Sequence, residues 1–392
     1  MGHLLALLIL WMAIMSFGVK LNVVHKWKYC EFEWENQQQK EDAINSGTYN
    51  TSRCMLGGVS KAEDGRIFMS TPKIDGPGTP VSLTIVTNET GSGGPLLRPY
   101  PDWSWYNNNS MCNGIINVYK LHIECNHIFV LDNGQSTETE QICDPKLLIF
   151  DLKNDMLVKT IYIPPYIAYN KTGFGLLVDP LVYIPNKECT RFLDEMIVFV
   201  ADTVGFGLVV YDSSTERMCR VESDYMKPTD ANFVIDDQNV TYVGGIFSLT
   251  IICDELYYAP IAGNEIYKIK IKTLLECPSR EKANKQTKLV KELSSQTLDI
   301  SSTKHYIFYS DSRTNSIVGT NSCTKSNNNT IILSQDDEKL QVISSMEIIS
   351  YWNQLIGLSN RYQKYATDTY NLSDINFHYF EMDLAAILQE MD

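Results

Sequence analysis

Three aspartates recur at the same place in a repeated strand pattern, and they are the residues most able to do chemistry. Asp132, Asp202 and Asp311 each end an apolar strand and stand directly before a turn. A carboxylate at the end of a strand, near a channel, could act as a general acid or base or bind a cation. Aspartate also caps turns by accepting backbone hydrogen bonds, which explains the same positions equally well. Both interpretations stay open at this point.

Other groups that could carry chemistry are better explained by structure. His122, Cys125 and His127 are close in sequence, but strand alternation places His122 on one face and the other two on the opposite face. Gly173-Phe174-Gly175 and Gly205-Phe206-Gly207 resemble half of a dinucleotide fingerprint, yet they lack the third glycine and lead into strands. We therefore expect no metal site and no cofactor, and no catalytic residue is identified.

The elements that must position these residues are repeated pairs of strands. An apolar strand that ends in a small or polar turn recurs six times at intervals of about 50 to 70 residues, and a second alternating strand follows each copy. The copies start at Ile67, Ile128, Ile197, Leu256, Tyr306 and Leu355. This repeat predicts an all-β protein, a six-bladed β-propeller. We expect residues 27–34 to supply the outer strand of the last blade, and a helix over residues 384–390.

The beginning of the chain and its cysteines indicate secretion. The uncharged apolar run from Leu4 to Phe17 is too short for a membrane span and is typical of a signal peptide, so we expect cleavage near Gly18 and one domain over residues 19–392. The chain has 10 cysteines and no CxxC pair, which fits disulfides in an extracellular protein. Seven N-x-S/T sequons predict N-glycosylation at Asn50, Asn88, Asn108, Asn170, Asn239, Asn328 and Asn371.

The charge balance excludes some partners. The formal net charge is -14. An acidic surface repels phosphate backbones and anionic lipid headgroups, so we expect neither nucleic acid nor a membrane as partner. The same charge would attract small cations.

Several motifs resemble the insect yellow and major royal jelly protein family. They are the block PLLRPYPDWSW from Pro95, CNGI from Cys112, FVLDNG from Phe129, PKLLIFDL from Pro145, VFVADTVGFGLVVYDSS from Val198, and the segment from Ser334 to Lys364. The colinear resemblance runs from about Trp27 to Phe380, and the royal jelly branch looks nearer than the fly branches.

The resemblance implies a secreted six-bladed propeller and several functions. Royal jelly relatives are nutritive secretions, some associated with sterol; yellow relatives are linked to dopachrome conversion; salivary relatives bind biogenic amines in the channel. Matching cysteine-bearing blocks implies the disulfides Cys112–Cys143 and Cys125–Cys189, with Cys30–Cys54 inferred from the closing strand. The family partner of Cys323 is absent, so it pairs with Cys219, Cys253 or Cys277, or stays free.

The ligand-binding roles of the amine-binding relatives carry over to three residues. A hydroxyl residue falls on Ser345 by spacing alone, and an asparagine with an aromatic two residues later falls on Asn360 and Tyr362. Asp132 is a further candidate for the ligand site. Arg361 stands where those relatives have glycine, so we expect serotonin-like amines to bind weakly or not at all.

Three functions therefore remain at this stage. The first is a non-enzymatic binding protein that holds a small apolar, sterol-like or amine ligand in the channel. The second is a nutritive or storage secretion. The third is an enzyme that converts catechol derivatives of the dopachrome type. Loss of an Asp from the usual DGI block, which reads Gly244-Gly245-Ile246 here, argues against channel chemistry.

Overall fold

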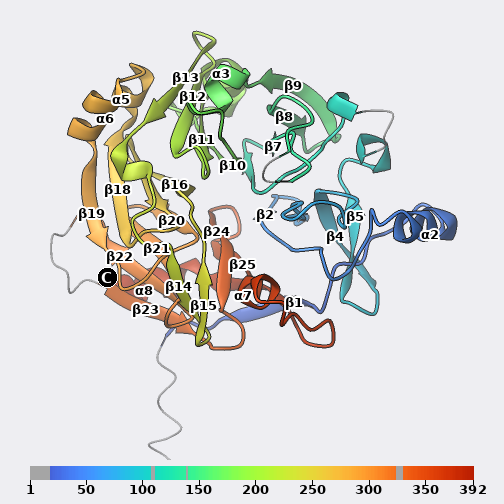
Figure 1. Cartoon of the computed structure of the whole chain (residues 1–392). Helices are drawn as coiled ribbons and strands as arrows, with labels where there is room; N and C mark the ends of the chain where they lie inside the picture. Colours follow the sequence, from blue (N-terminus) through green and yellow to red (C-terminus); the bar gives the residue numbers. More distant parts are fainter. Residues whose placement is uncertain (1–17, 107–110, 138–139, 324–329) are drawn as a thin grey trace, which may run out of the picture.

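The protein is a six-bladed β-propeller (Figure 1). The computed structural model describes residues 18–106, 111–137, 140–323 and 330–392. Six antiparallel four-stranded sheets stand around a central channel like the blades of a fan. The expected signal peptide and the sequons at Asn108 and Asn328 lie outside the described residues.

Each blade runs from an inner strand at the channel to an outer strand at the rim. Blade one contains β2 (Val59–Lys61), β3 (Ile67–Ser70), β4 (Leu83–Thr90) and β5 (Pro95–Pro99); blade two contains β6 (Leu121–Glu124), β7 (His127–Asp132), β8 (Lys146–Asp151) and β9 (Met156–Tyr162). Blade three contains β10 (Leu177–Tyr183), β11 (Ile197–Asp202), β12 (Gly207–Asp212) and β13 (Arg217–Glu222); blade four contains β16 (Ile246–Ile252), β17 (Glu255–Pro260), β18 (Glu265–Lys270) and β19 (Lys288–Glu292). Blade five contains β20 (Ile300–Thr303), β21 (Tyr306–Asp311), β22 (Ser316–Asn321) and β23 (Thr330–Gln335); blade six contains β24 (Val342–Ile349), β25 (Gln354–Asn360), β26 (Phe377–Asp383) and β1 (Asn22–Trp27).

The ring is closed by a strand from the N-terminal part of the chain. β1 pairs antiparallel with β26, and Trp27 lies opposite Phe377. The expected closing strand over residues 27–34 was therefore placed too late, since the outer strand of blade six ends at Trp27. The residues after Trp27 leave blade six and join blade one, where Phe32 forms a bridge with Leu97. An aromatic cluster around Trp34 and Trp103, whose rings stack at 4.9 Å, explains the aromatic content of this segment.

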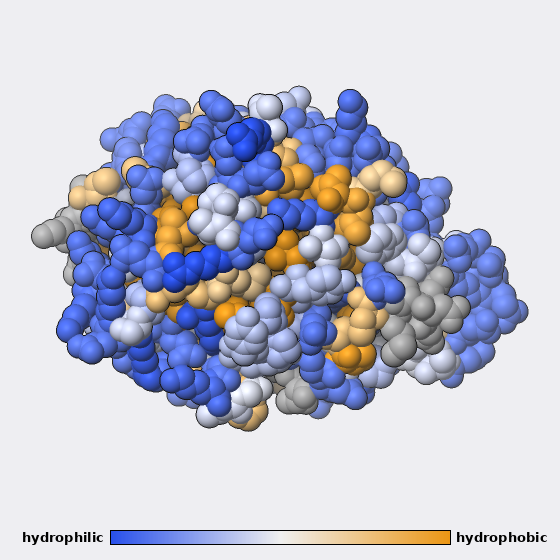
Figure 2. Space-filling view, turned by 90° about the horizontal axis from the view of Figure 1, so that it is seen from above, coloured by the Kyte–Doolittle hydropathy of each residue, from blue (hydrophilic) through white to orange (hydrophobic). Residues whose placement is uncertain are grey.

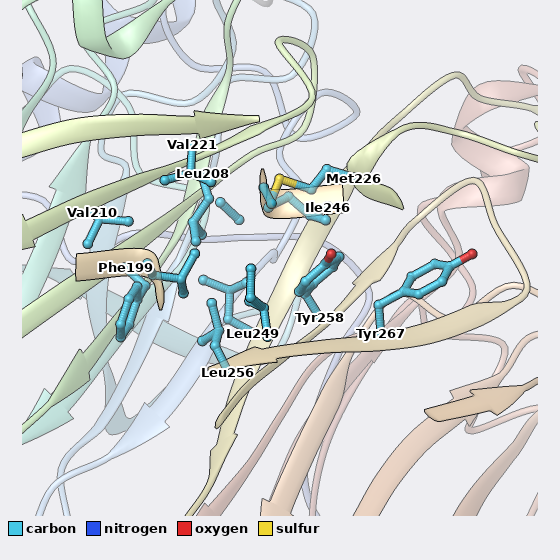
Figure 3. Packing of buried hydrophobic residues seen from close by; sticks show 14 of the residues in the cluster. Phe199, Leu208, Val210, Val221, Met226, Ile246, Leu249, Leu256, Tyr258 and Tyr267 are labelled. Carbon is cyan, nitrogen blue, oxygen red and sulfur yellow. The ribbon is translucent and has the colours of Figure 1, made fainter. Parts of the chain in front are cut away.

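Packing between neighbouring blades explains why the second strand of each blade, which is the first strand of the sequence repeat, is so apolar. Every residue of β11 is buried, because other elements cover both of its faces. Figure 3 shows one such contact, in which Phe199 and Val210 of blade three face Leu249 and Leu256 of blade four. The outer strands are more polar because they lie at the rim, and β9 is exposed over its first three residues.

Helices are short and lie outside the blades. They are α2 (Gln37–Asn45), α3 (Pro165–Ala168), α4 (Phe192–Glu195), α5 (Ile271–Leu275), α6 (Arg280–Gln286), α7 (Tyr362–Ala366) and α8 (Leu384–Met391). The last of these confirms the helix expected over residues 384–390. Within the described part of the chain, none of them is long and apolar enough to span a membrane. Figure 2 shows the rim of the disc, where hydrophilic residues surround a hydrophobic area.

Four disulfides join the loops and strand ends. Cys30–Cys54, Cys112–Cys143 and Cys125–Cys189 are present as expected, and Cys219 pairs with Cys277. Among the described residues Cys253 and Cys323 are free and exposed. Of the options open for Cys323, the structure therefore shows the free thiol.

The first prediction concerns ring closure. Trp27→Ala should lower the free energy of unfolding by about 3–5 kcal/mol, because it removes a large, fully buried side chain. The control is Val24→Ala on the same strand, where 40% of the side chain is exposed; its effect should stay within about 0.5 kcal/mol. Urea unfolding measures both. Equal effects of the two substitutions would show that β1 does not hold the ring.

The second prediction concerns the thiols. Iodoacetamide applied to the unreduced, unfolded protein should label Cys253 and Cys323 only, since the other cysteines are in disulfides. Peptide mass spectrometry locates the label. A labelled Cys219 or Cys277 would contradict the fourth disulfide.

Candidate functional site

The central channel is the place where all six blades contribute side chains. Its six inner strands are β2, β6, β10, β16, β20 and β24, and neighbouring inner strands contact each other around the ring. Two cavities lie along it. One is lined mainly by residues at or before the starts of the inner strands, and the other is lined along the inner strands and reaches past the ends of β10 and β16. We call the first the apolar cavity and the second the polar cavity.

The apolar cavity has a volume of about 100 Å³ and is lined by two of the four candidate ligand residues. Asn360, at the end of β25, and Tyr362, at the start of α7, both line it. The other lining residues are Met55, Leu56, Gly57, Pro72, Ile74, Tyr119, Phe233, Ile235, Val240, Tyr242, Phe247, Ile261, Leu298, Val342 and Ser344. No carboxylate and no imidazole belongs to this set.

Asn360 is held rigidly by the backbone around it. Its side-chain nitrogen donates to the Leu56 carbonyl at 3.2 Å, and its side-chain oxygen accepts from the Tyr362 amide at 3.0 Å. The first bond links blade six to the loop before blade one. The second caps the turn into α7, so Asn360 both caps a turn and lines the cavity.

The hydroxyl residue of the apolar cavity is Ser344. Ser345 instead lines the polar cavity, and its Oγ accepts from the Val59 amide at 3.1 Å. A bulge in the pairing of β24 with β25 lies between Ile343 and Ser345. Spacing alone therefore selects the neighbouring residue, and the structure does not bring Ser345 to Asn360 and Tyr362. The Ser344 Oγ is buried and has no hydrogen-bond partner among the described residues.

A hairpin between blades three and four covers the apolar cavity. It consists of β14 (Asn232–Ile235) and β15 (Gln238–Thr241), and Phe233, Ile235 and Val240 contribute to the cavity wall. Two buried glutamines fasten it: Gln296 donates to the Asn232 carbonyl at 3.0 Å, and Gln341 donates to Asp236 at 3.0 Å. The sequence repeat did not reveal this hairpin, because it lies between two blades and is not part of the repeating unit.

The three strand-end aspartates have structural contacts. Asp132 accepts backbone hydrogen bonds from Ile116, Asn117 and Gly134. Asp202 accepts from the backbone of Leu176 and Gly205 and pairs with Arg220 at 2.7 Å. Asp311 accepts from the Arg313 and Thr314 amides. None of the three lines either channel cavity.

His122, Cys125 and His127, which are close in sequence, also have structural contacts. Cys125 is bonded to Cys189, and His127 Nδ1 lies 2.7 Å from the Cys125 carbonyl. Only His122 reaches the channel. The described residues contain no group of three histidine, cysteine or acidic side chains that could hold a metal ion.

A buried ion pair separates the two cavities. Lys120 Nζ lies 2.9 Å from Asp299 Oδ1, and both side chains line the polar cavity. The same ammonium lies 4.6 Å from the ring centroid of Phe247, which lines the apolar cavity. Lys120 therefore faces a carboxylate on one side and an aromatic wall on the other.

The geometry defines a class of protein: a six-bladed propeller whose channel is divided into an apolar and a polar cavity. The sequence model of the family described as "Major royal jelly protein" matches residues 116–391. The chain is 31% identical to major royal jelly protein 1 of Apis mellifera, over 92% of this chain and 87% of that protein, and 31% identical to major royal jelly protein 2, over 91% and 81%. The chain belongs to the yellow and major royal jelly protein family.

A solved structure with a different sequence shares the fold. The chain superposes on a luciferin-regenerating enzyme with a TM-score of 0.50 and 7% identity, over 93% of this chain and 95% of that one. At this identity the similarity shows the propeller fold alone.

Arg361 does not line the apolar cavity. Its guanidinium lies 3.7 Å from Asp374. The expectation of weak amine binding remains a prediction, now for a different reason. An ammonium in this cavity would be desolvated without a carboxylate to pair with.

The third prediction follows from that lining. Serotonin, dopamine and histamine should show no binding that depends on Asn360, and calorimetric titration of the protein and of Asn360→Ala measures this. Sub-micromolar binding that disappears in Asn360→Ala would place the chain among the amine binders.

Proposed function

We propose that the protein is an extracellular, non-enzymatic binding protein that holds a small, neutral, mostly apolar molecule in the apolar cavity. The observation that carries this is the unpartnered Ser344 hydroxyl beside the fixed Asn360 amide, in a cavity walled otherwise by apolar and aromatic groups. Ligand sites combine such walls with a few polar groups that fix orientation.

The size of the cavity limits the ligand. An engineered apolar cavity of about 150 Å³ binds benzene, so about 100 Å³ suits a molecule with a single ring. A sterol would fit only after displacement of the β14–β15 hairpin. The glutamine contacts of that hairpin are few, which makes it the natural route for a ligand to enter.

The disulfides and the exposed sequons support an extracellular setting for this site. Four disulfides are typical of an oxidising compartment. Among the sequons with described residues, the asparagine is half-buried at Asn170 and exposed, hence accessible for glycosylation, at the other four: Asn50, Asn88, Asn239 and Asn371. Asn239 lies on the covering hairpin, where a glycan would stand at the rim of the cavity.

Catechol conversion and a nutritive role would each require different structural features. Conversion of catechol derivatives needs titratable groups that converge on the substrate, and the apolar cavity offers only tyrosines. A purely nutritive secretion, which the names of the royal jelly relatives suggest, needs no cavity with a reserved hydroxyl.

The fourth prediction tests the binding site. Ile74→Trp should fill the apolar cavity and weaken binding of para-cresol, which has one ring and one hydroxyl, by about tenfold or more. Ile44→Trp in α2 is the matched control, because Ile44 is 50% exposed and far from the lining set. Calorimetric titration compares them. Equal affinity in both variants, or no binding to the unaltered protein, would overturn the proposal.

A further inference from the structure

The polar cavity is a second site with different chemistry. Its volume is about 570 Å³, within the range of small-molecule sites. Residues from all six inner strands line it. Five carboxyl groups belong to the lining, those of Glu124, Asp179, Asp254, Asp299 and Glu347. The buried cation among them is Lys120, so acid outnumbers base in this part of the channel.

Lys120, the buried cation of the polar cavity, is already paired with Asp299. Asp299 accepts from Lys120 and also from the Met346 amide. Asp179 is 9% exposed and accepts one bond from the Leu249 amide at 3.1 Å. No lysine or arginine partner within ion-pair distance is recorded for Asp179 among the described residues.

Two neighbouring groups of the polar cavity, His122 of β6 and Glu347 of β24, each have a hydrogen-bonding atom without a well-aligned partner. His122 Nδ1 lies 3.8 Å from Glu347 Oε1. Their other atoms, His122 Nε2 and Glu347 Oε2, are buried and have no well-aligned hydrogen bond among the described residues, although the Ser60 hydroxyl lies close enough to Glu347 to lower its pKa. Buried polar atoms are nearly always paired, so two such atoms beside one cavity indicate a missing ligand.

We propose that the polar cavity binds a small aliphatic organic cation carrying primary ammonium groups, with Glu347 and Asp179 as its carboxylate partners. An ammonium donates three hydrogen bonds, which the two carboxylates and the His122 imidazole can accept. The hydroxyls of Thr250 and Ser302, which bond to each other at 2.6 Å, add acceptors on the adjoining strands. This site is independent of the apolar cavity and of the function proposed for it.

A metal ion fits this cavity less well. The described carboxylates and histidines do not converge in a group of three that could hold one. Carboxylates spread around a cavity suit an extended organic cation, which can reach more than one of them.

Protonation gives the site a measurable signature. Burial raises the pKa of Glu347 to about 8, and the nearby carboxylates of Asp299, Glu124 and Asp179 add to the shift. Burial likewise raises the pKa of Asp179 to about 7, which Lys120 partly offsets. Burial lowers the pKa of His122 to about 4, so this ring is a neutral acceptor at neutral pH. The other titratable groups that act on these residues or their neighbours are Lys187, Glu63 and Tyr379.

The sign of the pH dependence follows directly. Below pH 7 both carboxyls carry protons, and a cation must displace them. A bound cation favours the ionised forms and lowers both pKa values. Affinity should therefore rise with pH between about 6 and 9 and level off above, with release of at least about one proton per ligand at pH 7.

Calorimetric titration with putrescine tests the proposal. The unaltered protein should bind putrescine more tightly at pH 8.5 than at pH 6, and titrations in buffers of different ionisation enthalpy should show proton release. Glu347→Gln and Asp179→Asn should each weaken binding at pH 8.5 by about tenfold or more, since each removes a charge-assisted hydrogen bond. Glu89→Gln, at an exposed position on β4, should leave it unchanged.

The result is decisive even if a variant does not fold. Proton release is measured on the unaltered protein alone. Absence of putrescine binding at both pH values, binding without proton release, or equal binding in Glu347→Gln would each overturn the proposal. Because Ile74→Trp alters only the apolar cavity, it separates this outcome from failure of the function proposed above.

Discussion

Ring closure is the constraint on which the rest of the structure depends. A propeller blade has an edge strand at its rim, and six wedge-shaped blades enclose a channel only when the last packs against the first. β1 achieves this by pairing with β26, while Trp27 Nε1 donates to the Pro95 carbonyl of blade one at 2.7 Å. One side chain thereby ties the ends of the ring together. The Asn360 amide adds a second link, through Leu56 before blade one.

Closure also places six strand starts at one end of the channel and six strand ends at the other. The apolar cavity forms at the first end because the loops there, and the β14–β15 hairpin, bring aromatic and aliphatic side chains over the channel. Toward the second end the inner strands present carboxylates, hydroxyls and one imidazole. Lys120 and Asp299 stand between them, and a buried ion pair of this kind is stable only while both partners stay in place.

Much of the fold could be predicted from sequence, because blades repeat and their second strands are buried on both faces. The alternating strands gave the number of blades and the residues of most strand pairs. The closing strand was harder: β1 lies at a rim and its pattern is weak, whereas residues 28–34 carry the aromatic signal but pack elsewhere. Ser344 lines the apolar cavity and Ser345 lines the polar cavity, and spacing alone could not show this because a bulge in β24 shifts the faces by one residue.

The polar cavity could not be found by pattern. His122, Asp179 and Glu347 come from three blades. Asp179 and Glu347 are ordinary strand residues in their sequence context, and His122 was noted only for its spacing from Cys125 and His127. Asp132, Asp202 and Asp311 looked more promising because they repeat. They repeat because each strand end needs the same cap, which is a structural requirement of the fold.

The most direct test of the account is a crystal structure of the protein purified from its natural source. The account predicts density for a small ring-bearing molecule between Tyr362 and the β14–β15 hairpin, within hydrogen-bond distance of the Ser344 hydroxyl. Well-defined density for Ser344 paired with a protein atom, in a cavity collapsed by its neighbours, would contradict it.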